Sequence, residues 1–159
     1  MKNLFKLLGL LFIYISFTNS IYGQAGYIQP SPTSPDEEVT LFIDINQSQD
    51  GLQNNALSAM LDVMSDTTHV YLWAWNPSSP IAGNGEWTAS NEAMRLNRIG
   101  PKLYSMTFVP TEFFDIEGAE LYASGISCLA KLKDGSPIDG FEGEPKTEDL
   151  YIPIVPKLC

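Results

Sequence analysis

The stretch that decides the fold is HVYLWAWN, residues His69 to Asn76. Its aromatic and β-branched residues favour an extended strand, and the two prolines that follow within four residues end it. Side chains alternate along a strand, so one face is expected to carry Val70, Leu72 and Ala74 and the other Tyr71, Trp73 and Trp75. The first face can join a core. The second must be covered by another layer, covered by a loop, or left as a surface on which sugars stack.

Segments on both sides of this stretch also read as strands separated by turn signals. We expect strands over 39–46, in a hairpin between 93 and 110, over 123–133 and over 150–155, the last at a sheet edge or strand end because of Pro153. A short helix is expected near 55–65, and a single helical turn in PTEFF from Pro110. These elements predict an all-β, immunoglobulin-like antiparallel β-sandwich of six to seven strands, with one or two short helical turns.

Composition limits the partners. The chain has 159 residues with a formal net charge of −10, and the first 23 residues hold two of its nine basic residues and none of its acidic ones. Without them the charge is −12. Phosphate binding needs clustered Lys and Arg, so no nucleic-acid partner is expected.

The first residues indicate export. Residues 1–23 combine a basic start, a short apolar run from Leu7 to about Phe17 and a small residue at Gly23, which is typical of a signal peptide cleaved before Gln24. The apolar run is too short to span a bilayer comfortably, so we expect no transmembrane segment after cleavage and a periplasmic or extracellular location. Residues 24–37 are Pro-rich and predict an extended, poorly packed lead-in to a folded domain over 38–159.

The two cysteines leave two alternatives open. Cys128 lies within an apolar run and Cys159 is the last residue. In an oxidising compartment they can pair, which would tie down the C-terminal tail. Alternatively, Cys128 is a buried structural residue and Cys159 a free thiol.

Signatures of catalysis are missing from the sequence. A single histidine, His69, and two cysteines do not supply the usual zinc ligand sets, and the chain has no phosphate-binding glycine loop or nucleophile elbow. We therefore expect no enzyme, no cofactor and no metal. One alternative stays open, because an acidic loop offers carboxylates to calcium from Asp134, Asp139, Glu142 and Glu144.

The aromatic segment and the tryptophan after it carry a family resemblance. The order HVYLWAW, a Gly- and Pro-containing loop and GEWTA resembles the starch-binding modules of carbohydrate-binding families 25 and 26, which are small β-sandwiches. By that resemblance Trp73, Trp75 and Trp87 are candidates for the sugar platform, with Tyr71 beside them.

A second resemblance rests on VTLFIDIN, PTEFF and LKDG. These elements are similar to secreted immunoglobulin-like domains found with the outer-membrane starch-utilisation proteins of Gram-negative bacteria.

Two functions follow as expectations. The first is a secreted, non-catalytic carbohydrate-binding module that uses the aromatic platform on a polysaccharide. The second is a secreted structural or interaction subunit that docks through the same aromatic patch on another secreted or outer-membrane protein. A tryptophan in a central strand often fills the core instead, so exposure of the rings is the observation that matters.

Overall fold

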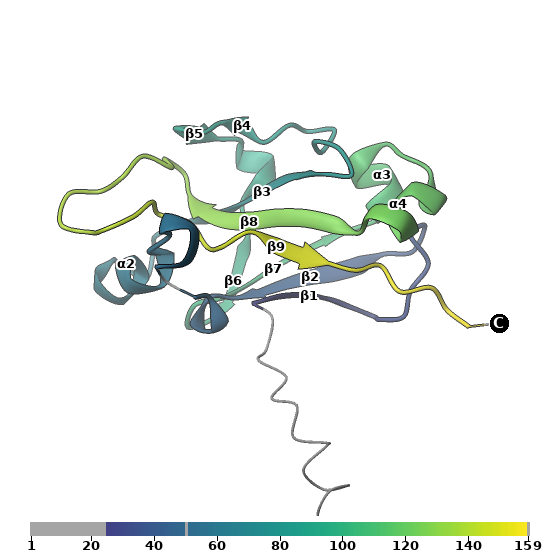
Figure 1. Cartoon of the computed structure of the whole chain (residues 1–159), viewed down its shortest axis with the longest axis horizontal. Helices are drawn as coiled ribbons and strands as arrows, with labels where there is room; N and C mark the ends of the chain where they lie inside the picture. The colour runs from purple at the N-terminus through teal and green to yellow at the C-terminus, as the bar shows by residue number, and fades with distance from the viewer. Residues whose placement is uncertain (1–24, 50, 159) are drawn as a thin grey trace, which may run out of the picture.

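The computed structural model describes residues 25–49 and 51–158, so the predicted signal peptide over 1–23 and Cys159 lie outside the described residues. The described chain is mostly β, with antiparallel sheets and short helices (Figure 1). One sheet has the order β1-β2-β7-β6, comprising β1 (Gly26–Gln29), β2 (Val39–Asp44), β7 (Leu103–Phe108) and β6 (Asn97–Gly100). The other has the order β3-β8-β9, comprising β3 (Val70–Asn76), β8 (Ile126–Leu132) and β9 (Leu150–Ile152).

The core lies between these two sheets. The inward residues alternate with outward ones as the strand period requires, and Leu41 and Ile43 of β2 face Leu72 and Ala74 of β3 across a cluster in which each is at most 1% exposed. Cys128 from β8 joins this cluster. The strands predicted over 39–46 and 69–76 are therefore present as β2 and β3, although β2 ends at Asp44 because residues 45–47 form a 3-10 turn. The predicted hairpin is confirmed as β6 and β7.

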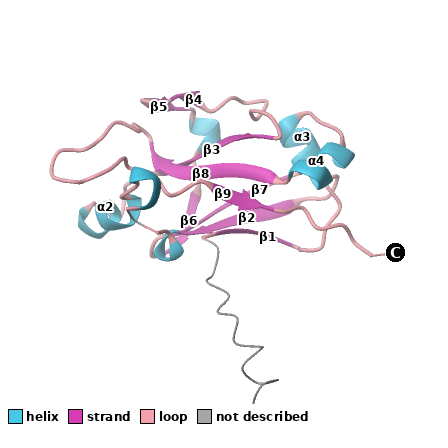
Figure 2. Ribbon diagram, viewed as in Figure 1, coloured by secondary structure: helices cyan, strands magenta, loops and turns pink. Residues whose placement is uncertain are grey.

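Short helices close the two ends of the layers (Figure 2). Helix α2 (Leu57–Val63), preceded by the 3-10 turns η1 (Ile45–Gln47) and η2 (Leu52–Asn54), lies at one end and confirms the helix expected near 55–65. Helices α3 (Pro110–Phe114) and α4 (Gly118–Ser124) lie at the other. Helix α3 is the turn predicted from PTEFF, with Phe114 buried.

Three further sequence expectations differ from the structure. The strand expected over 150–155 ends as β9 at Ile152, just before Pro153. The strand expected from Ala123 begins only at Ile126, because residues 118–124 form α4 and Gly125 ends that helix at a φ of +61°. The lead-in expected over 24–37 is partly folded, because β1 pairs with β2 along four residues and buries Ile28. Prolines 30, 32 and 35 follow β1 rather than interrupt it, so they do not remove hydrogen bonds from the ladder.

A long loop joins β8 to β9 and extends beyond the sheets at the end where α2 lies (Figure 1). Its two ends are fastened together, since Leu132 N donates to Pro145 O at 2.9 Å and Thr147 N donates to Ala130 O at 2.8 Å. At its tip, a Cβ placed on Gly140 would meet no atom within 4 Å. The base of this loop is thus anchored to β8 while its tip is open.

Candidate functional site

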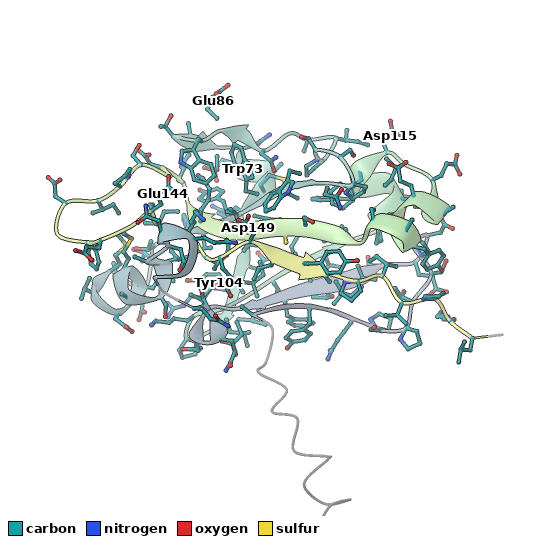
Figure 3. The ribbon with its side chains drawn as sticks, viewed as in Figure 1. Trp73, Glu86, Tyr104, Asp115, Glu144 and Asp149 are labelled. Carbon is teal, nitrogen blue, oxygen red and sulfur yellow. The ribbon has the colours of Figure 1, made fainter. Side chains whose placement is uncertain are left out.

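The aromatic segment forms β3 with the predicted alternation. Val70, Leu72 and Ala74 are buried against the core, and Tyr71 and Trp73 point to the opposite, outer face of the sheet. In Figure 3, Trp73 lies on the side of β3 that faces the small hairpin of β4 (Gly85–Glu86) and β5 (Ala89–Ser90). The outer face of β3 is thus the place where the candidate residues meet.

Residues 83–96, the covering loop, extend over part of this face. They contain β4, β5 and the 3-10 turn η3 (Glu92–Met94). Asn84 pairs with the backbone of Ala74, accepting from its N at 3.0 Å and donating to its O at 2.7 Å. At the far end, Leu96 N donates to Val70 O at 2.9 Å. Of the three possibilities for the outer aromatic face, coverage by a loop therefore applies to Tyr71 and, in part, to Trp73.

Trp87 of the covering loop packs on Trp73, so the loop brings a third tryptophan beside β3. The ring centroids are 5.2 Å apart and the planes meet at 78°, an edge-to-face contact. Trp87 Nε1 donates to Gly135 O at 3.0 Å, and Gly135 N donates to Trp87 O at 2.9 Å. The two rings therefore meet at a steep angle, with Trp87 hydrogen-bonded to Gly135, and do not form a flat stacking platform.

A buried lysine, which sequence reasoning missed, lies against both indoles. Lys131 of β8 is 0% exposed, and its Nζ is 5.6 Å from the Trp73 ring centroid and 5.0 Å from that of Trp87. The ammonium donates to Ser90 Oγ at 2.8 Å, Leu132 O at 2.8 Å and Lys133 O at 3.0 Å. Its three donors are thus matched by three oxygens, and two rings add cation–π contacts.

Burial lowers the pKa of Lys131 to about 8, and the charge of Asp134 opposes part of this shift. The sequence did carry one signal for this position. Alternation along β8 places Lys131 on the same face as Ser127, and the register pairs it with Tyr71. The pairing of Lys131 with Tyr71 depends on which residues of two distant strands lie opposite each other. The spacing of residues along the chain does not define this register.

Tyr71 is the most deeply buried of the candidate residues, at 1% exposure. Its hydroxyl donates to Glu92 Oε1 at 3.0 Å, and Glu92 also pairs with Lys133, whose Nζ lies 6.0 Å from the Tyr71 ring centroid. Burial, followed by the hydrogen bond to Glu92, raises the pKa of Tyr71. The ring therefore helps to hold the covering loop and presents little surface to a ligand.

Trp75 differs from the other tryptophans because it is exposed, at 40%. The register between β3 and β8 shifts there, from Ala74 opposite Cys128 to Asn76 opposite Ser127, so Trp75 is the extra residue of a β-bulge. A bulge re-aims the side chain that it carries. Ser127 also pairs with Tyr151 of β9, which is 52% exposed and packs over Gly125. The exposed Tyr151 is thus the cross-strand partner of Ser127, and Asn76, the residue after the bulged Trp75, lies opposite the same serine on β3.

An open cleft of about 450 Å³ lies at the other end of β3. Its lining includes His69, the edge of Tyr71, Lys133 and Asp134. Asp134 accepts from Ser136 N at 2.8 Å, which lowers the pKa of that carboxyl. This cleft and Trp75 lie at opposite ends of the strand and are separate places on the surface.

The other sequence candidates stand as follows. Within 25–49 and 51–158, no three or more His, Cys, Asp or Glu side chains are grouped so as to hold a metal ion, the acidic loop included. Cys128 is buried, which raises the pKa of its thiol to about 12, and its expected partner Cys159 lies outside the described residues. No helix in the described part of the chain is both long and apolar enough to cross a bilayer.

Comparisons with protein-family models, curated proteins and solved structures found no match.

Proposed function

We propose that this protein is an exported, non-catalytic module of immunoglobulin-like fold that binds carbohydrate through the exposed aromatic residues of its three-stranded sheet. Its strand order supports the fold assignment. The sheets β1-β2-β7-β6 and β3-β8-β9 correspond, strand by strand, to the ABED and CFG sheets of constant-type immunoglobulin domains.

The observation that carries the proposal is the exposed Trp75 on its bulge. An indole held outward on a rigid strand offers an apolar face for the C–H groups of a sugar without any loop having to order first. Tyr151 of β9 supplies a second exposed ring on the same sheet, and its cross-strand partner Ser127 on β8 adds a hydroxyl group. This combination of apolar faces and a neutral hydrogen-bonding group suits a polyhydroxylated ligand.

The remaining candidates take a supporting role in this proposal. Trp73 and Trp87 are half-buried, meet at 78° and both contact Lys131. We therefore propose that these two residues keep the covering loop rigid. Tyr71 anchors the same loop through Glu92. The roles of Tyr71, Trp73 and Trp87 as sugar-stacking residues, which the resemblance to starch-binding modules implies, stay predictions.

Substitution of Trp75 tests the proposal. Trp75→Ala removes the exposed indole and little core packing, so we expect the melting temperature to stay near that of the wild type. Affinity for a bound α-glucan should fall tenfold or more, as for the removal of a central aromatic contact. Retardation in native gels containing starch or glycogen, and quenching of tryptophan fluorescence by malto-oligosaccharides, measure this loss.

Ile81→Ala is the matched control, because Ile81 is a large apolar residue with 67% exposure outside the proposed surface. It should leave retardation unchanged. If wild type responds to none of a panel of α- and β-glucans, the carbohydrate proposal is refuted. A stable dimer or hetero-complex that Trp75→Ala disrupts would instead support the interaction subunit as the function.

A further inference from the structure

We propose a second carbohydrate site on the opposite side of the molecule, in a hollow on the outer face of the four-stranded sheet. The hollow has a volume of about 540 Å³ and is lined by Gln29, Pro30, Ser31, Thr40 and Phe42. The inference rests on the proposed function for the class of ligand, a carbohydrate, but it concerns different residues from those of the proposed site on β3. Its ligand is a short stretch of neutral saccharide.

The aromatic part of this site is Phe42, whose ring is supported by that of Tyr27. Tyr27 of β1 and Phe42 of β2 are cross-strand partners, with ring centroids 5.2 Å apart and planes only 17° from parallel. Tyr27 is 41% exposed, and Phe42 forms a wall of the hollow. A stacked, supported pair resists reorientation, so a sugar ring that packs against Phe42 does not have to order it.

Neutral hydrogen-bonding groups continue from these rings along the same face. The register places Gln29 opposite Thr40, and Thr40 opposite Thr107 on β7. The hydroxyls of Thr40 and Thr107 are 3.0 Å apart and hydrogen-bonded to each other, which leaves further donor and acceptor capacity on both. An amide and a hydroxyl thus lie at the edge of an aromatic wall, the arrangement that recognises a sugar by its C–H face and its hydroxyls together.

The lining is uncharged although the protein is strongly acidic. All five described residues that line the hollow are neutral, in a chain with 28 charged residues and a net charge of −10. Desolvating a charged ligand here would lack a compensating ion pair, whereas a neutral polyol exchanges its hydrogen bonds with water for those of Gln29, Ser31 and Thr40. The volume lies within the range of small-molecule sites.

The test uses substitutions that remove hydrogen-bonding groups without removing core. Thr40→Val keeps the side-chain shape, and Gln29→Ala truncates an exposed residue. Backbone amide shifts of the purified protein are recorded by NMR during titration with maltoheptaose and, separately, cellohexaose. We expect one of these probes to shift the amides of Gln29, Ser31 and 40–42, and the double variant to weaken that binding at least fivefold.

Controls separate this site from the proposed one on β3. Thr88→Val and Gln47→Ala are the same changes at exposed positions elsewhere and should leave the affinity unchanged. In a Trp75→Ala background the amide shifts of Gln29, Ser31 and 40–42 should persist, so this site can succeed where the first one fails. Shifts confined to β3, β8 and β9, or absent with both probes, would overturn the inference. A proline-rich peptide that binds more tightly than either glycan, as measured from the shifts of the same amides, would also overturn it.

Discussion

Lys131 is a buried cation held by three oxygens and two indoles, and it forms no ion pair with a carboxylate among the residues that the structure describes. Burying an ammonium is costly, and the lowered pKa expresses that cost. Charge-assisted hydrogen bonds contribute about 1.5 to 3 kcal/mol each and the cation–π contacts add to them, but the lowered pKa means that together they offset only part of the desolvation of the ammonium. We therefore infer that Lys131 holds β5 and the base of the long loop to β8 through these hydrogen bonds.

Lys131→Met should lower the free energy of unfolding by about 1 to 3 kcal/mol at pH 7.5, because Ser90 and two carbonyls lose their donor. The difference between wild type and variant should then grow with pH. The unfolded lysine keeps its proton up to about pH 10.5 and the folded one releases it near pH 8, so the unfolded state binds more protons between these values and wild-type stability rises there.

Urea denaturation of both proteins at pH 7.5 and pH 10.5 measures this difference. Tyr71 and Cys128 titrate in both proteins, so their effects cancel. We expect an increase of up to about 3 kcal/mol, the equivalent of a shift of two to three pKa units. An unchanged difference would show that Lys131 titrates normally in the folded protein.

At the scale of elements, the covering loop is attached by several hydrogen bonds, and where Trp87 meets Gly135 it also makes a close backbone approach. A Cβ on Gly135 would lie 2.5 Å from Trp87 Cε2 and 2.6 Å from its Nε1. The glycine is therefore required by close approach, since a side chain there would displace the indole from Trp73 and Lys131.

Gly135→Ala should destabilise the protein by about 1 to 3 kcal/mol, as overpacking does, and release the covering loop before the sheets unfold. Thermal unfolding gives the first effect, and exchange of the Trp87 indole N–H in NMR gives the second. Gly100→Ala is the control, because a Cβ there would meet Leu103 at an ordinary 3.5 Å. Equal protection of the Trp87 indole in Gly135→Ala and wild type would contradict this account.

The sequence predicted the elements better than their contacts. Period-two alternation sufficed for β2, β3 and the β6–β7 hairpin, because each has one buried face. It failed for β1, whose four residues adjoin prolines, and for α4, whose apolar residues run directly into β8. Proximity of Trp87 to Trp73 followed from chain order. The position of Lys131 and the exposure of Trp75 depend on strand register and a bulge, which are set by the pairing of distant segments.

For the whole molecule, the prediction concerns export. Lys2 and Lys6, the apolar run and Gly23 have the composition that signal peptidase substrates share, so the exported protein should begin near Gln24. N-terminal sequencing of protein recovered from the periplasm or the medium checks this. An intact Met1 in a membrane fraction would refute it.

The open tip of the loop between β8 and β9 offers a practical handle. Because hydrogen bonds close its base at Leu132 and Thr147, a biotin-acceptor peptide inserted after Gly140 should not disturb either sheet. Protein attached through that peptide to a sensor chip would leave both outer faces of the molecule open to the same analyte. Each face can then be blocked by substitution in turn, so the contributions of one and two contact surfaces to retention can be separated in a single orientation.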